Sequence, residues 1–306
     1  MTSSVLKYCI LLYLLFVSIV GEATNFQIDT ISLWQGTNER YGKEVSLYAY
    51  IPEHSNTVSI IICPGGSYHW LDSYGEGFNV AEWLCSQGIT AFVLLYRTAG
   101  CAEIAWHTRI LFRGKRHPDM ICDAQRAIKY VRENATEYGI DPGKVGIMGF
   151  SAGGHLAMST ACFCGTDFQT ASLNVDRNSL RPEFVAAIYP VVTMRSPFVH
   201  KRSRRGILGD NRIANKAMQD SLSIELHIPS DCPPVFIINC HDDPVVPYQN
   251  SELLDAALSK NNIPHKYIQY ETGRHGFGVS DYYGSPECRE WKDEFIDWLK
   301  KIYCGL

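Results

Sequence analysis

The run Gly149-Phe150-Ser151-Ala152-Gly153-Gly154 constrains this chain more than any other stretch of its sequence. It closes the apolar stretch Val145–Phe150, which is typical of a buried strand, and it precedes His155-Leu156-Ala157-Met158, which opens a helical pattern. Small residues two positions before and after the serine allow a sharp strand-to-helix turn that holds the serine in a strained conformation. The helix N-terminus then presents unpaired amides where negative charge develops on an oxygen. The pattern predicts that Ser151 is a nucleophile.

Short apolar runs alternate with helical patterns along the chain, which indicates an α/β fold with a mostly parallel central sheet and helices on both faces. No repeat, low-complexity tract or linker is present, so one domain over residues 24–306 is expected. The expected strands are Val45–Ile51, Val58–Cys63, Thr90–Leu95, Val145–Phe150, Val185–Tyr189, Val235–Cys240 and Lys266–Tyr270. The expected helices are Phe78–Ser86, Asp119–Tyr138, Gly153–Cys162, Ser251–Ser259 and Glu287–Tyr303.

Two stretches, 100–117 and 193–210, break this rhythm and are expected to be long connections. Long loops in compact domains tend to be functional or disordered. The second stretch contains the basic run His200-Lys201-Arg202-Ser203-Arg204-Arg205. It is interpreted either as a solvated basic loop or as a wall of the substrate-binding site.

The first 23 residues are typical of a secretory signal peptide. Lys7 precedes the apolar run Tyr8–Val20, and small residues flank the break at Gly21-Glu22-Ala23. The apolar run is too short for a membrane anchor, because a spanning helix needs roughly 20 residues. We therefore expect cleavage after Ala23, a secreted or periplasmic protein, and no membrane association of the mature chain.

Composition narrows the class of ligand. The formal net charge of −4 gives no electrostatic case for binding nucleic acid or an anionic membrane surface, so a small molecule or neutral polymer is the better candidate for a ligand.

The sequence contains eleven cysteines. Cys63 and Cys240 close strand-like runs, where a free cysteine behaves as a small buried hydrophobe. Cys288 and Cys304 flank the last helix and could pair with other cysteines.

A serine nucleophile needs a base, and the base needs an orienting carboxylate. In hydrolases with a serine at such a turn, the acid and then the histidine follow along the chain. Asp242 and Asp243 follow one expected strand, and His275 follows the next. All three therefore lie at the carboxyl ends of strands, where such sheets place their sites. His275 is the predicted base, and Asp243 or its neighbour Asp242 is the predicted orienting acid.

The second oxyanion donor is expected from the turn Pro64-Gly65-Gly66-Ser67-Tyr68, which follows an early expected strand. Its glycines let backbone amides face a carbonyl oxygen without an intervening side chain. The predicted donors are the amides of Gly66 and Ala152, with Ser67 as an alternative to Gly66. Ser67 and Tyr68 are also candidates for contact with substrate. The alternative interpretation is an ordinary tight turn, and His155 is expected to pack or form a hydrogen bond beneath the serine.

These residues resemble the carbohydrate-esterase branch of the α/β-hydrolases. The sequence is similar to acetylxylan and feruloyl esterase-like enzymes that are related to the acetyl-esterase and hormone-sensitive-lipase group. The shared motifs, which span nearly all of the mature chain, are Pro64-Gly65-Gly66-Ser67-Tyr68, Tyr96-Arg97, His117-Pro118, Asp123-Ala124-Gln125-Arg126-Ala127, Gly149 to Ala157, Asp242-Asp243 with Val246-Pro247, and His275-Gly276-Phe277. Ser67 stands where a third glycine is usual. The position of Val246-Pro247, three residues after the acid as in related hydrolases, favours Asp243 over Asp242.

The resemblance implies an α/β-hydrolase fold and an exported esterase that removes short acyl groups, chiefly acetyl, from plant-wall polysaccharide such as xylan. It implies attack by Ser151, with His275 as base and Asp243 as orienting acid, through an acyl-enzyme and without a metal or organic cofactor. One alternative is a serine exopeptidase of the prolyl-oligopeptidase type, but those enzymes usually carry a large additional N-terminal domain, and only residues 24–44 precede the first expected strand. The other is a non-catalytic binding protein, which would typically lack one of the three residues.

Overall fold

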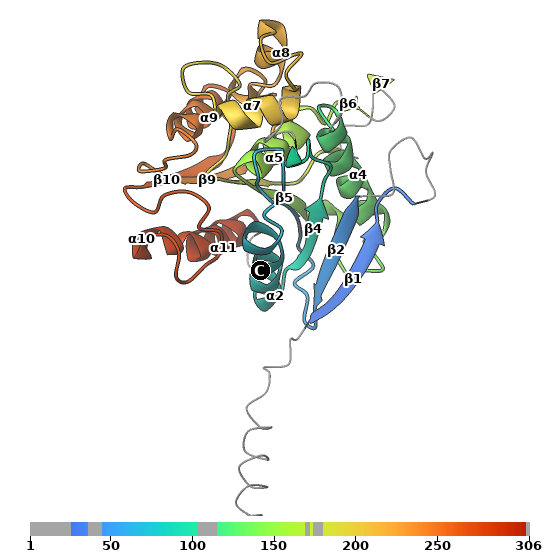
Figure 1. The fold of residues 1–306 in the computed structure, drawn as a ribbon. Coiled ribbons are helices and arrows are strands. Elements are labelled where there is room, and N and C mark those ends of the chain that lie inside the picture. The colour runs from blue at the N-terminus through green and yellow to red at the C-terminus, as the bar shows by residue number, and fades with distance from the viewer. Residues whose placement is uncertain (1–25, 36–44, 103–114, 169–171, 174–179, 304–306) are drawn as a thin grey trace, which may run out of the picture.

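The computed structural model describes residues 26–35, 45–102, 115–168, 172–173 and 180–303, and eight strands of this part form one sheet (Figure 1). The strand order is β1-β2-β4-β3-β5-β8-β9-β10. From β4 to β10 all neighbours are parallel, whereas β2 is antiparallel to both β1 and β4. The strands are β1 (Phe26–Ser32), β2 (Ser46–Pro52), β3 (Ser59–Cys63), β4 (Thr90–Leu95), β5 (Val145–Phe150), β8 (Val185–Ile188), β9 (Val235–Cys240) and β10 (His265–Tyr270), and a separate ribbon pairs β6 (Thr166–Asp167) with β7 (Ser172–Leu173).

This mostly parallel sheet confirms the fold class that the sequence predicted. Strands β4, β5 and β9 have the expected bounds, and the other four expected strands differ by one residue at an end or at both. The edge strand β1 was not predicted. Its burial alternates between half-buried and exposed positions, so it lacks the continuous apolar pattern of the inner strands.

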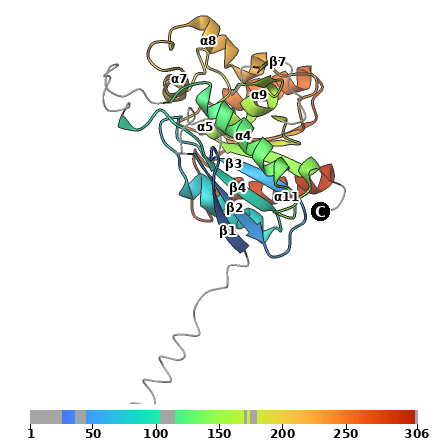
Figure 2. The same cartoon turned by 90° about the vertical axis from the view of Figure 1, so that its right-hand side faces the viewer.

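Helices cover both faces of the sheet (Figures 1 and 2). One face packs against α4 (Asp119–Glu133), α5 (Ala152–Cys162) and α9 (Gln249–Lys260), and the other against α2 (Asn79–Ser86) and α11 (Trp291–Ile302). The pleat of β3 divides its side chains between these layers, because Ile61 faces the first and Ile60 and Ile62 face the second. The described α-helices also include α7 (Lys201–Leu208) and the short helices α8 (Lys216–Ser221) and α10 (Pro286–Arg289).

The stretch 193–210 is not simply a long connection, because it contains the helix α7 (Lys201–Leu208). Its basic residues begin an amphipathic pattern in which Ser203, Gly206, Ile207 and Leu208 are buried. Gly206 packs on the turn after β3, since a Cβ there would lie 2.4 Å from the backbone oxygen of Ser67. Most of the other stretch, residues 103–114, lies outside the described part, as does the expected signal peptide.

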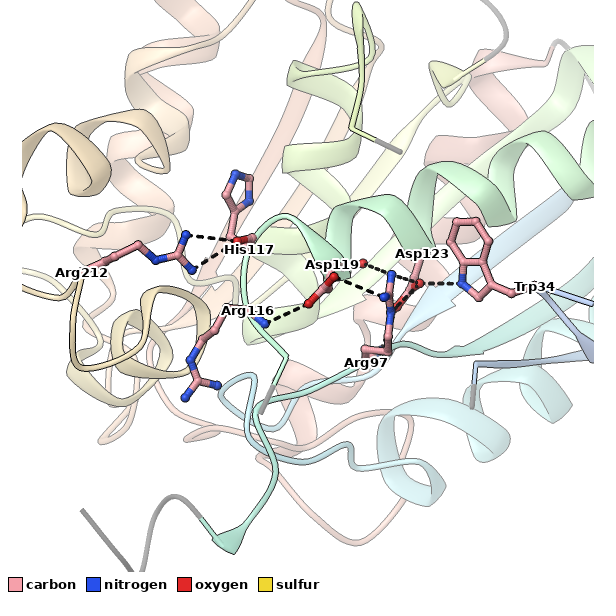
Figure 3. Close-up of polar contacts among 7 residues, drawn as sticks. All are labelled: Trp34, Arg97, Arg116, His117, Asp119, Asp123 and Arg212. Carbon is pink, nitrogen blue, oxygen red and sulfur yellow. Dashed lines mark hydrogen bonds and ion pairs between the residues drawn. The ribbon is translucent and has the colours of Figure 1, made fainter. Parts of the chain in front are cut away.

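A buried ion pair ties α4 to the end of β4 (Figure 3). The guanidinium of Arg97 donates to Asp123 at 2.7 Å, and the Arg97 backbone amide donates to the same carboxylate at 2.9 Å. The indole of Trp34 adds a third donor at 2.8 Å. All three residues are buried, so the carboxylate is fully partnered away from water. The motif residues Arg97 and Asp123 therefore have a structural role.

Within the described residues, no helix is long and apolar enough to cross a bilayer, and no cluster of histidine, cysteine, aspartate or glutamate is arranged to hold a metal ion. Cys63, Cys240 and Cys288 are buried free thiols. Cys304 lies outside the described part, so the possibility that it pairs with another cysteine stays a prediction.

Candidate active site

Ser151 occupies the sharp turn between β5 and α5. Its backbone torsions are φ 53° and ψ −117°, a conformation that side-chain-bearing residues rarely adopt. The Ser151 amide donates to the Ile188 carbonyl of the neighbouring strand at 3.0 Å, which holds the turn on the sheet. Strain of this kind costs of order 1–3 kcal/mol and persists where the surrounding structure imposes it. The turn is the one that the sequence predicted.

The glycines around Ser151 are required by close backbone contacts. A Cβ on Gly149 would lie 2.0 Å from the Gly153 carbonyl oxygen, and a Cβ on Gly153 would lie 2.0 Å from the Cys63 carbonyl oxygen. Neither position can hold a larger residue without movement of backbone, since real Cβ atoms do not approach so closely. The turn itself therefore requires glycine at 149, whereas the end of β3 requires glycine at 153.

His275 reaches Ser151 from the loop after β10, which we call the histidine loop (residues 271–279). Its Nε2 lies 2.9 Å from Ser151 Oγ, and its Nδ1 lies 2.6 Å from Asp243 Oδ2. Because the carboxylate accepts from Nδ1–H, Nε2 is the atom that accepts the serine proton. The structure thus brings together Ser151, His275 and Asp243, which stand at the ends of three different strands.

The neighbouring acids Asp242 and Asp243 have different contacts. Asp243 Oδ1 accepts the backbone amides of Val245 at 2.7 Å and Val246 at 2.9 Å, which leaves Oδ2 for His275, and its side chain is 1 % exposed. Asp242 is exposed, and its Oδ1 accepts the amide of Arg274 at 2.8 Å. Asp243 therefore contacts the imidazole, while Asp242 fixes the backbone of the histidine loop.

The turn Pro64–Tyr68, which we call the glycine turn, lies beside the serine. A Cβ on Gly65 would be 2.9 Å from Ser151 Cβ. Gly66 has φ 131°, and a Cβ there would lie 2.1 Å from the Trp70 carbonyl oxygen, so only glycine fits. Within the described residues, the amides of Gly66 and Ala152 donate to no protein acceptor. Both predicted oxyanion donors are consequently available, although their role stays a prediction.

The two predicted substrate contacts have different positions. The side chain of Tyr68 is fully buried, and its hydroxyl donates to His155 Nδ1 at 2.8 Å. Tyr68 therefore points into the core beneath α5, which argues against the predicted contact with substrate. Ser67 is 5 % exposed and stays a candidate.

His155 forms the hydrogen bonds that the sequence led us to expect beneath the turn. Its Nε2 donates to the Leu222 carbonyl at 2.7 Å, so its Nδ1 accepts from Tyr68. Burial lowers the pKa of His155 to about 4, because the charged imidazolium is poorly solvated there. His155 is thus a neutral anchor between α5 and the glycine turn.

Sequence reasoning missed two buried residues next to the site. Glu76 lies in the short helical turn Tyr74–Phe78, and Tyr189 directly follows β8. The Tyr189 hydroxyl donates to Glu76 Oε1 at 2.8 Å, and the Tyr189 ring lies 4.7 Å from the His275 ring. The available signal was an acid flanked by two glycines, Gly75-Glu76-Gly77, between the aromatic residues Tyr74 and Phe78.

A family model described as BD-FAE matches residues 47–258. Among curated proteins, the chain is 32 % identical over 257 residues to endo-1,4-beta-xylanase B of Butyrivibrio fibrisolvens, covering 82 % of this chain and 38 % of that protein. It is 29 % identical over 266 residues to an acetylxylan esterase of Xylanibacter ruminicola, covering 85 % of this chain and 48 % of that protein. The chain therefore spans less than half the length of either relative.

Among solved structures, an acetyl ester-xyloside bifunctional hydrolase from Caldicellulosiruptor lactoaceticus superposes with a TM-score of 0.76 at 30 % identity. The superposition covers 91 % of this chain and 97 % of that one. The family match and these relatives confirm the resemblance that was inferred from the motifs.

Proposed function

Since the chain belongs to the BD-FAE family, we propose that it is a serine esterase that hydrolyses short acyl esters, chiefly acetyl, on plant-wall polysaccharide such as xylan. The observation that carries this proposal is the hydrogen-bonded series Ser151–His275–Asp243 at a strained strand-to-helix turn. Two relatives are named as an acetylxylan esterase and an acetyl ester-xyloside hydrolase, and these names support the choice of acetyl as the acyl group and of xylan as the polysaccharide.

The reaction follows from this geometry. His275 Nε2 takes the proton of Ser151 Oγ as the oxygen attacks the ester carbonyl, and Asp243 stabilises the imidazolium that forms. The amides of Gly66 and Ala152 stabilise the oxyanion of the tetrahedral intermediate, and the N-terminus of α5 adds its partial positive charge. As the bond from the acyl carbon to the sugar oxygen breaks, His275 protonates that oxygen, which leaves as a hydroxyl group, and the acetyl group stays on Ser151. A water molecule, activated by His275, releases acetate and restores the serine.

The first test is hydrolysis of p-nitrophenyl acetate by the wild type and by Ser151→Ala. We expect turnover by the wild type and its loss in the variant. No activity in the wild type, or full activity in Ser151→Ala, would refute the esterase proposal and favour a non-catalytic binding protein. Release of acetate and ferulate from the corresponding xylans, measured in parallel, separates the two acyl groups, and we expect acetate to dominate.

The adjacent acids provide a matched pair of variants. Asp243→Asn is expected to lower kcat by about 10⁴-fold, the effect known for removing the orienting charge of such a triad. Asp242→Asn keeps an oxygen that can accept the Arg274 amide and is expected to lower kcat less than tenfold, an effect of about 1 kcal/mol. The reverse ranking would show that Asp242 is the orienting acid.

We also propose that the protein is exported and that residues 1–23 are removed. The support is the charge and apolar pattern of that segment. Expression with its own N-terminus, followed by N-terminal sequencing of the extracytoplasmic product, is expected to give Thr24 as the first residue. A product that retains Met1 or remains in the cytoplasm would contradict export.

A further inference from the structure

A second carboxylate, Glu76, lies beneath the proposed catalytic residues. The residue is 4 % exposed, Oε2 accepts the Gly65 amide at 2.7 Å, and Oε1 accepts the Tyr189 hydroxyl at 2.8 Å. Within the described residues both donors are neutral, and no lysine or arginine forms an ion pair with Glu76. Burial of a carboxylate without a cationic partner is costly, so a position that keeps one is a candidate for a functional role.

One oxygen of Glu76 holds the glycine turn. A Cβ on Gly65 would lie 2.4 Å from Glu76 Oε2 and 2.9 Å from Ser151 Cβ, so the carboxylate and the serine flank the same glycine. The Gly65 carbonyl in turn accepts the Asp72 amide at 3.0 Å. Because Gly66 is the next residue, the hydrogen bond to Glu76 fixes the direction of the amide that we assign to the oxyanion.

The other oxygen of Glu76 holds the histidine loop through Tyr189. The Tyr189 hydroxyl donates to Glu76 and accepts the Gly278 amide at 3.1 Å. The Tyr189 ring lies 4.7 Å from the His275 ring and 4.7 Å from the Phe277 ring. One carboxylate therefore connects the oxyanion side of the site to the loop that carries the base.

The charge of Glu76 is coupled to that of His275. Burial raises the pKa of the Glu76 carboxyl, and the negative charge of Asp72 raises it further. Positive charge on His275 lowers this pKa, as do the hydrogen bonds from Tyr189 and Gly65. In the described part of the chain, the charged and titratable groups that act on His275 include Asp243, Glu76, Tyr189 and His200. Asp243 and Glu76 are the two carboxylates of this set, and they reach His275 from different elements.

We propose that Glu76 is a positioning residue of the reaction, which aligns the glycine turn with the histidine loop and, as a carboxylate, stabilises the imidazolium that forms on His275. This inference rests on the proposed esterase function and assigns to Glu76 a part in that same site. Because Glu76 is buried, its effect reaches the chemistry through Gly65, Tyr189 and the electric field at His275.

The test is the pH profile of p-nitrophenyl acetate hydrolysis by Glu76→Gln. Glutamine has the same shape and can still accept the Gly65 amide, but it carries no charge and cannot accept from both donors. We expect kcat to fall by about 10- to 100-fold with little change in KM. We also expect the acidic limb of kcat/KM to move to lower pH by about one unit, because the imidazolium loses a stabilising negative charge.

Two further variants keep the test decisive. Glu225→Gln is the matched control, because burial also raises the pKa of Glu225 but this residue lies outside the proposed site. This variant should leave kcat and the acidic limb of kcat/KM unchanged. Tyr189→Phe removes the hydroxyl between Glu76 and Gly278 and should lower kcat even if Glu76→Gln does not fold. Folding of each variant is checked by its thermal midpoint.

The outcomes separate the two proposals. A folded Glu76→Gln with wild-type kcat and an unmoved acidic limb overturns the inference while leaving the esterase intact, and so does a folded Tyr189→Phe with wild-type kcat. A lower kcat with an unmoved acidic limb overturns the electrostatic role. An inactive wild type overturns the esterase function itself, and this inference with it.

Discussion

Replacing His155 by glutamine is expected to make the folded state less sensitive to acid. Burial lowers the pKa of this imidazole from 6.5 to about 4 in the folded protein, where Nε2 donates to Leu222 and Nδ1 accepts from Tyr68. Between these two pKa values the unfolded chain binds a proton that the folded chain does not. The stability that depends on neutral His155 is therefore complete above about pH 6.5 and is lost as pH falls towards 4.

The magnitude follows from the size of the pKa difference. A separation of about 2.5 units corresponds to about 3 kcal/mol, with a maximum slope of about 1.4 kcal/mol per pH unit. At pH 7, His155→Gln should be less stable than the wild type by about 1–3 kcal/mol, because glutamine reproduces the two buried hydrogen bonds imperfectly. By pH 4 this difference should have fallen by about 3 kcal/mol, so the variant becomes at least as stable as the wild type.

Urea unfolding followed by tryptophan fluorescence at several pH values between 4 and 7 measures this difference directly. Other buried groups contribute to the pH dependence of both proteins, so the difference between them isolates His155. The exposed His54 provides the control, and His54→Gln should follow the wild type at every pH. A gap between the wild type and His155→Gln that stays constant from pH 7 to pH 4 would refute the reasoning.

Three further substitutions test the packing that supports the site. Gly153→Ala should lower the thermal midpoint strongly or prevent folding, because its Cβ would lie 2.0 Å from the Cys63 carbonyl oxygen; a wild-type midpoint would contradict the assigned contact. Asp123→Ala should lower the free energy of unfolding, measured in urea, by about 3–5 kcal/mol, because it removes the main partner of the buried Arg97. A decrease below about 1 kcal/mol would show that water replaces the carboxylate. Trp291→Ala should cost about 3–5 kcal/mol by the same assay, because the fully buried indole fills the layer under α11 and donates to a backbone carbonyl; a smaller effect would mean that this layer repacks.

Much of the fold could be predicted because its signals are local. Continuous apolar runs mark the inner strands, and β4, β5 and β9 have the bounds expected from them. The strand β1 escaped prediction because an edge strand with one exposed face lacks that pattern. The helix α7 escaped because its arginine-rich start hides the buried positions that follow. The formation of each element depends on a tertiary contact, which is the pairing of β1 with β2 and the packing of α7 on the glycine turn.

The sequence by itself determined the serine turn and the order of acid and base along the chain. Gly149 lies against the Gly153 carbonyl within the same turn, so its need for a small residue is local to the motif. The motif Val246-Pro247 favoured Asp243 over Asp242, and the tertiary structure shows the contact of Asp243 with His275. Only the tertiary structure decided that Tyr68 points into the core and that Glu76 lies beneath the serine. The direction of a side chain at a turn, and the partners of a buried charge, depend on segments far away in the chain. Local patterns therefore cannot encode them, whereas packing fixes them.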